Sequence, residues 1–136
     1  CPYTHLLYEM GNASKEQYMP MAKALAHFAY DMHSKGVLHL DFSPGNILWE
    51  YDHDGNIIFS IVDINRMHFG TITQKQACCS FSRLWGPKEF IVSIVSEYAQ
   101  LAGYDISSSM NICLKERRRF WTRYQRKREI EFNLEL

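Results

Sequence analysis

Hydrophobic positions in the first quarter of the 136-residue chain predict one long helix. Between Ser14 and Gly36, apolar residues recur at alternating steps of four and three, which places them on one face of a helix. Those residues are Tyr18, Ala22, Leu25, Ala29 and Met32. Ser14 and Gln17 have the spacing of a capping box, and Gly36 fits a left-handed stop. Because proline is unfavourable inside a helix, we expect Pro20 to begin the main helix or to follow a separate first turn.

Two short apolar runs in the middle of the chain predict a β-hairpin. The runs cover residues 47–51 and 57–62, and the segment 52–56 between them, Asp-His-Asp-Gly-Asn, is a strong turn signal. Residues 2–8 are rich in aromatic and apolar side chains and predict a further short strand. Residues 37–46 are too interrupted for a helix, so we expect a rigid loop there.

The C-terminal half of the chain is expected to be mostly helical. Helices are predicted over residues 76–85 and 89–102, and Gly103 is expected to end the second of them. Residues 107–109, all serine, are expected to cap a last helix. The tail 130–136 alternates apolar and polar residues, which is compatible with a strand or with a chain end. These elements together predict an α+β fold dominated by helices.

Composition narrows the class of protein. With 46% hydrophobic and 22% charged residues, the chain has the composition of a folded domain, and its apolar runs are far shorter than the ~20 residues of a membrane-spanning helix. The four cysteines form no CxxC pair, so we expect no structural zinc, and a reducing cytoplasm is the simplest compartment. Cys78 and Cys79 are expected to be small apolar residues of a helix. Because the first residue is Cys1, we expect a piece of a longer protein.

The chemistry-bearing residues cluster around the predicted hairpin. Asp41 and Asn46 precede it and Asp63 follows it, so the hairpin would gather two carboxylates and an amide at one end of a small ribbon. Such oxygen ligands suit Mg²⁺, which proteins usually hold through one or two side chains while phosphate oxygens fill other positions. A carboxylate free of the metal can orient a hydroxyl toward phosphorus. The order of the three residues therefore predicts phosphoryl transfer, although each one alone is commonly a local cap.

The pattern HxDxxxxN, followed by a hairpin that ends in an apolar residue and Asp, resembles the catalytic and metal loops of protein-kinase-like folds. The resemblance implies that Asp41 is the catalytic aspartate, that Asn46 and Asp63 bind Mg²⁺, and that His39 braces the loop. It further implies that Leu48 lies under the adenine ring of ATP.

The same resemblance also has implications for the hinge and for the N-terminal lobe of a kinase. Glu9-Met10 follows a predicted strand and resembles the hinge whose backbone reads adenine. The Gly-rich loop and ATP-binding lysine of a kinase N-terminal lobe are not found in this sequence. We therefore expect residues 1–136 to be a single kinase-like C-terminal lobe that is inactive alone.

Other residues distinguish branches of the superfamily. Ser43 stands where protein kinases carry lysine, the metal loop reads Asp-Ile-Asn-Arg over residues 63–66, and no Ala-Pro-Glu segment follows. The segments 39–48 and 62–70, and the later 81–86, are similar to the bacterial lipopolysaccharide kinase family. That resemblance implies ATP- and Mg²⁺-dependent phosphorylation of Kdo or heptose in the lipopolysaccharide inner core. Two alternatives stay open: a kinase of another small-molecule or protein hydroxyl, and a non-catalytic, pseudokinase-like binding module.

The C-terminal block carries eight Lys or Arg against one Glu between Lys115 and Arg128, although the net charge of the chain is zero. In one interpretation an apolar stripe faces the core and the basic residues are merely solvated. The stripe comprises Met110, Cys113 or Leu114, Trp121 and Tyr124. In the other, basic residues attract phosphorylated sugar or an anionic membrane at the cytoplasmic face. The residues concerned are Arg117, Arg118, Arg119, Arg123, Arg126, Lys127 and Arg128. Arg66 and Arg83 are candidate contacts for acceptor phosphates. Nucleic acid is not an expected partner, because the aromatic residues are few and expected to be buried.

Overall fold

The structure is a computed structural model that describes residues 4–5, 14–129 and 135. Within these ranges the chain forms four α-helices, which are α2 (Lys15–Ser34), α3 (Gln74–Ser80), α4 (Lys88–Ala102) and α5 (Ile106–Gln125). It also forms short strands, which are β1 (Thr4–His5), β2 (Val37–His39), β3 (Ile47–Tyr51), β4 (Ile57–Ile61) and β5 (Met67–Phe69). The α+β prediction is confirmed. Among the described residues, no helix is both long and apolar enough to cross a membrane.

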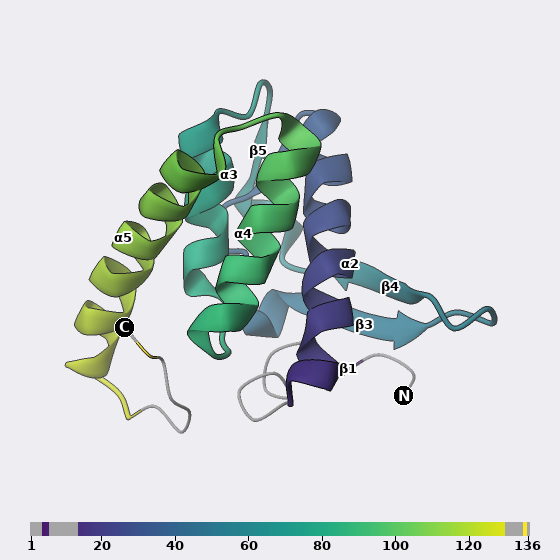
Figure 1. Cartoon of the computed structure of the whole chain (residues 1–136), viewed down its shortest axis with the longest axis horizontal. Coiled ribbons are helices and arrows are strands. Elements are labelled where there is room, and N and C mark those ends of the chain that lie inside the picture. The colour runs from purple at the N-terminus through teal and green to yellow at the C-terminus, as the bar shows by residue number, and fades with distance from the viewer. Residues whose placement is uncertain (1–3, 6–13, 130–134, 136) are drawn as a thin grey trace.

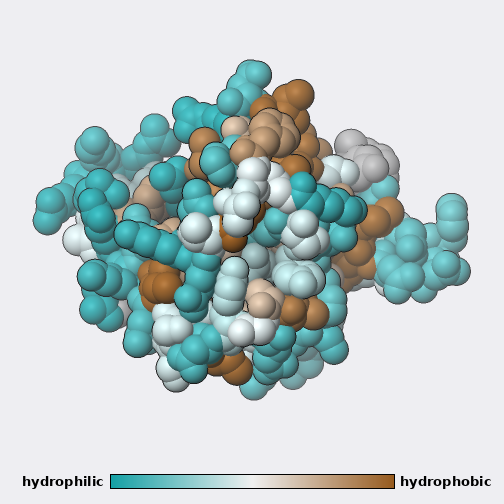
Figure 2. Space-filling view, turned by 90° about the horizontal axis from the view of Figure 1, so that it is seen from above, coloured by the Kyte–Doolittle hydropathy of each residue, from teal (hydrophilic) through white to brown (hydrophobic). Residues whose placement is uncertain are grey.

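The strands form two small antiparallel sheets. The first has the order β1-β3-β4, with Ile47 opposite Ile61, and the second pairs β2 with β5. The predicted hairpin is confirmed as β3–β4, and it projects away from the helices as a hydrophilic turn (Figures 1 and 2). The predicted loop 37–46 is partly wrong, because its first three residues form β2. Local pattern could not reveal a three-residue strand whose partner lies about thirty residues further on.

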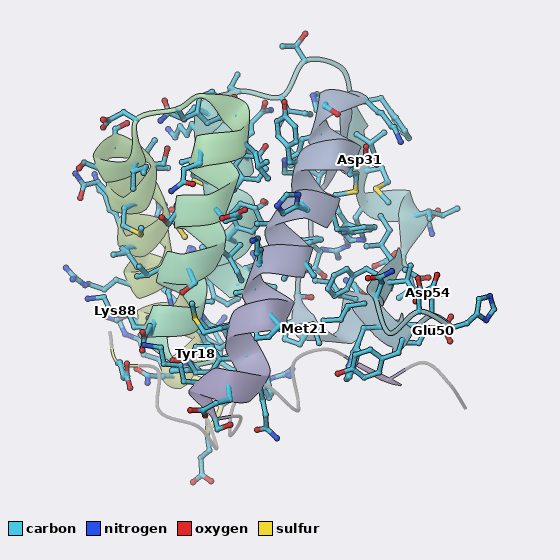
Figure 3. All side chains as sticks on the ribbon, turned by 45° about the vertical axis from the view of Figure 1, so that its right-hand side comes forward. Tyr18, Met21, Asp31, Glu50, Asp54 and Lys88 are labelled. Carbon is cyan, nitrogen blue, oxygen red and sulfur yellow. The ribbon has the colours of Figure 1, made fainter. Side chains whose placement is uncertain are left out.

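The helices form the core that supports these sheets. Helix α4 packs against α2 on one side and α5 on the other, and α5 also covers α3 (Figure 1). Near the N-terminal ends of α2 and α4, the Tyr18 hydroxyl donates to the Glu89 carboxylate at 2.9 Å (Figure 3). Cys78 is buried and Cys79 half-buried in α3, both as free thiols, as the sequence predicts. Burial raises the pKa of both thiols, so they act as small apolar residues.

Helix α2 corrects the prediction for Pro20. The helix runs without interruption from Lys15, and Pro20 lies inside it. The backbone N–H of Ser14 donates to Gln17 Oε1 at 2.9 Å, which stabilises the first turn before the proline is reached. Pro20 is exposed, so water can satisfy the Glu16 carbonyl that loses its helical partner. The left-handed stop at Gly36 is confirmed by its φ of 78°.

Two C-terminal boundaries also differ from prediction. Asp105, and not a serine of the segment 107–109, caps α5, because its side chain accepts a hydrogen bond from the Ser108 N–H at 2.8 Å. The helix expected over 76–85 is α3, which starts two residues earlier and ends at Ser80, followed by a 3₁₀ turn over Phe81–Arg83. The end of α4 at Gly103 is confirmed. Apart from Glu135, the tail 130–136 lies outside the described residues.

Buried His33 makes stability depend on pH. Its Nδ1 lies 2.7 Å from the Tyr98 hydroxyl, and burial lowers its pKa to about 4. An unfolded chain protonates this histidine near pH 6.5, so between these values the unfolded state binds more protons. We expect the free energy of unfolding to be constant above pH 6.5 on this account and to fall by roughly 3 kcal/mol as pH drops toward 4. Urea unfolding across this range measures the loss. His33→Gln, which does not titrate, should flatten the slope; an unchanged slope would contradict the prediction.

Candidate functional site

Two turns of the chain meet where the two sheets adjoin. The first turn, residues 40–46, connects β2 to β3, and the second, residues 62–66, connects β4 to β5. Leu40 donates its backbone N–H to the Arg66 carbonyl at 2.7 Å, and Val62 donates to the Asn46 carbonyl at 2.9 Å. These bonds bring together the two sequence segments that carry the predicted site. Asp41 and Asn46 lie on the first turn, and Asp63 lies on the second.

His39 braces this junction from within. Its side chain is buried, its Nδ1 accepts the backbone N–H of Asp41 at 3.0 Å, and its Nε2 lies 2.8 Å from the Val62 carbonyl. Because Nδ1 is an acceptor, the ring proton is on Nε2, which donates to Val62. One neutral imidazole therefore fixes the backbone before Asp41 relative to the backbone before Asp63. This geometry suits a positioning residue.

Asp41 is held by donors on two sides. Asn46 Nδ2 donates to the Asp41 carbonyl at 2.9 Å and to its Oδ2 at 3.1 Å, and Arg83 Nη1 donates to Oδ1 at 3.3 Å. The Asp41 side chain keeps 25% of its surface exposed, so another molecule can still reach it. The carboxylate is thus oriented and accessible, as a group that receives a hydroxyl proton must be.

Asn46 and Asp63 present the oxygen atoms that could hold a metal. The Asn46 amide nitrogen is used by Asp41, and within the described part of the chain its Oδ1 accepts no hydrogen bond. Asp63 has a left-handed backbone (φ 63°, ψ 57°), which Asp tolerates better than most residues, and its carboxylate lies 3.8 Å from Arg66 Nε. The described residues contain no cluster of three His, Cys, Asp or Glu side chains suited to a metal. One carboxylate and one amide oxygen fit Mg²⁺ that shares its remaining positions with phosphate and water.

The predicted nucleotide contacts are only partly described. Leu48 lies in β3 opposite Ser60 and is half-buried. Glu9 and Met10 lie outside the described residues. Their assignment to adenine binding stays a prediction.

Arg83 belongs to the site in a way that the sequence did not show. Besides its ion pair with Asp41, its guanidinium lies 5.0 Å from the centre of the Phe120 ring. Asp41 and Arg83 are 42 residues apart, and Phe120 is on another helix, so no local spacing signals this arrangement. Arg83 links the turn that carries Asp41 to the C-terminal half of α5.

The basic block of α5 requires one correction. Arg117 is buried, with 1% of its surface exposed, and its Nη2 donates to the Gly86 carbonyl at 3.4 Å. It lies four residues after Cys113 and four before Trp121, both buried, so it occupies the core-facing stripe. The other six basic residues that were assigned to an anionic surface are exposed. Arg117 is therefore excluded as a membrane contact.

A comparison with protein-family models matches the part of the chain that carries the two turns. The family model described as lipopolysaccharide kinase (Kdo/WaaP) family matches residues 6–85, which is more than half of the chain. The chain belongs to this family. The match contains Asp41, Asn46, Asp63 and Arg83, so the junction of the two turns lies within the segment that matches the family. No curated protein and no solved structure matches the chain.

The bracing role of His39 can be measured in this lipopolysaccharide kinase family member. His39→Leu leaves the partly buried Asp41 N–H and Val62 carbonyl without their partner, so we expect the free energy of unfolding to fall by about 1–3 kcal/mol. Urea unfolding measures the loss, with exposed His53→Leu as the matched control. His39→Asn, whose amide oxygen can replace Nδ1, should recover part of the stability. A variant as stable as the His53 control would show that the two bonds do not hold the junction.

Proposed function

We propose that this chain carries the catalytic centre for phosphoryl transfer from ATP to a sugar hydroxyl of the lipopolysaccharide inner core. The observation that carries the proposal is the Asp41 carboxylate, held by Asn46 and Arg83 on a turn that is hydrogen-bonded to the turn carrying the exposed Asp63. Membership of the lipopolysaccharide kinase family supports the kinase class. The ATP and Mg²⁺ dependence and the Kdo or heptose acceptor are part of the proposal.

Each residue has a distinct role in this proposal. Asp41 orients the acceptor hydroxyl and takes up its proton, because it is the accessible carboxylate that Asn46 and Arg83 position. Asn46 Oδ1 and the Asp63 carboxylate would hold Mg²⁺, which when bound to the nucleotide neutralises phosphate charge. His39 keeps the two turns in register and does not take part in proton transfer.

The placement of the site supports the kinase-like C-terminal lobe. The catalytic turn precedes a hairpin, the metal residue follows it, and helices pack behind both, which is the order expected of such a lobe. We propose that nucleotide binding is completed by a Gly-rich loop and a lysine outside this chain.

Transfer of labelled phosphate tests the proposal directly. The full-length protein is incubated with Mg²⁺ and γ-labelled ATP, with lipopolysaccharide core in one reaction and a generic protein in another. We expect label in the sugar lipid. Label on the protein would retain a kinase and change its acceptor, whereas no label from a folded protein would favour the binding module.

The exposed basic residues at the end of α5 and directly after it support a second part of the proposal, which is peripheral contact with an anionic membrane surface at the cytoplasmic face. Six exposed basic residues between Arg118 and Arg128 make the end of α5 and the turn that follows it strongly positive. Each can add about 1 kcal/mol near anionic lipid, and salt screens the attraction. We expect sedimentation with vesicles of phosphatidylglycerol and phosphatidylcholine to fall as salt rises. Equal sedimentation with pure phosphatidylcholine would contradict this contact.

A further inference from the structure

A pocket beside Asp41 joins the catalytic turn to α5. One wall is formed by Asp41, Ser43 and the Pro44-Gly45 segment, and the other by aromatic side chains that include Phe120 and Tyr124. Its volume is about 350 Å³, which is within the range of small-ligand sites. An acceptor in this pocket would have Asp41 at one side and aromatic side chains at the other.

A second pocket adjoins the first. It has a volume of about 260 Å³ and shares Arg83, Phe120 and Tyr124 with the first, while Arg123 and Lys127 complete it. Phe120 and Tyr124 are stacked, with ring centres 6.0 Å apart. The two pockets therefore share a wall along the C-terminal half of α5, and we call them together the groove.

All charged residues that line this groove are basic except Asp41. Its basic residues are Arg83, Arg123, Lys127 and Arg128, and Asp41 is the single acidic residue among those that line the two described pockets. Arg83 lies between Asp41 and Phe120, which places a guanidinium where the two pockets meet. Arginine binds carboxylate and phosphate groups with two parallel hydrogen bonds.

We propose that this groove is the acceptor site and selects an anionic sugar, with the sugar ring against Phe120 and Tyr124 and its carboxylate or phosphate held by Arg123 and Lys127. Arg83 spans the ring-binding and anion-binding halves and keeps Asp41 in place for the reacting hydroxyl. The aromatic side chains provide apolar area for the sugar, while the basic side chains provide its selectivity. This inference rests on the proposed function, because it takes the side of Asp41 that faces α5 as the acceptor side.

Tryptophan signals allow binding to be observed without catalysis. Trp85 and Trp121 line the first pocket, whereas Trp49 lies in β3 and serves as an internal reference. The full-length protein, labelled with ¹⁵N and without nucleotide, is titrated with glucose, glucuronate and glucose 6-phosphate. Indole signals are assigned with Trp49→Phe and Trp85→Phe. We expect the Trp85 and Trp121 signals to shift with an anionic sugar at a concentration about threefold to fivefold lower than with glucose.

Charge variants of α5 then test the anion-binding half. Arg123→Gln and Lys127→Gln should each remove most of the preference for the anionic sugar. Lys115→Gln, which removes the same charge from a position of α5 outside both pockets, should retain it. A response to glucuronate alone or to glucose 6-phosphate alone would identify the anion as carboxylate or phosphate. Equal binding of glucose, equal shifts of the Trp49 signal, or an equal loss in Lys115→Gln would overturn the inference. Because no phosphoryl transfer is measured, these outcomes are independent of whether the proposed kinase activity holds.

Discussion

Asp41→Asn is expected to lower the rate of phosphoryl transfer by about 10²- to 10⁴-fold, which is the usual contribution of a positioned acid–base group. Asparagine has nearly the same shape and can keep a hydrogen bond with Arg83 or Asn46, but it cannot take up the hydroxyl proton. The loss should therefore appear in kcat, with little change in the KM for ATP. Transfer of labelled phosphate by the full-length variant measures it.

The control for this experiment is a carboxylate distant from the site. Asp31→Asn removes an exposed acidic group of α2, whose partner is Lys35, and should leave both constants unchanged. Urea unfolding should show that the Asp41 variant is folded. If Asp41→Asn retains the rate of the Asp31 control, Asp41 is not the base and the proposed mechanism is wrong.

Asp63→Asn is expected to lower activity by about 100-fold or more at limiting Mg²⁺, because losing a group that merely orients a metal ligand already costs about 10- to 100-fold in affinity. Asparagine is chosen over alanine because it also tolerates the left-handed backbone at this position. The folded state should be nearly unaffected, since the carboxylate is exposed and its ion pair with Arg66 is long. The apparent affinity for Mg²⁺, measured from the rate at increasing metal concentration, reports the change.

Asp54→Asn is the matched control for Asp63. Asp54 is an exposed carboxylate in the turn of the hairpin, at the opposite end of the same strands (Figure 3). Its removal should not change the dependence on Mg²⁺. An Asp63 variant with the metal dependence of this control would mean that Asp63 is not a ligand.

Much of the fold follows from local sequence. The hairpin 47–61 has a turn segment and flanking apolar runs that leave few alternatives, and the stop at Gly36 needs only a residue that accepts a positive φ. Predictions failed where packing outweighed local preference. Pro20 lies within α2 because burial of the helix face on both sides of it stabilises a continuous helix.

Arg117 is a second case in which the local sequence predicted the wrong environment, here because the residue is charged. Its place between Cys113 and Trp121 gives it a core-facing position by periodicity, but its residue type suggested solvent. Burial lowers the pKa of its guanidinium, and the carbonyl of Gly86, thirty-one residues earlier in the chain, accepts a hydrogen bond from it.

By itself the sequence determined which residues can carry the chemistry and their order around a hairpin. The hairpin brings together the segments of Asn46 and Asp63 that flank it, while the Leu40–Arg66 bond and His39 join the Asp41 segment to them. Only the tertiary structure decided that Arg83 and the aromatic residues of α5 complete the site. The physical reason is that these contacts join segments tens of residues apart, which the packing of α3 and α4 against α5 brings together. Residues so far apart in the sequence have no local spacing from which their contact could be predicted.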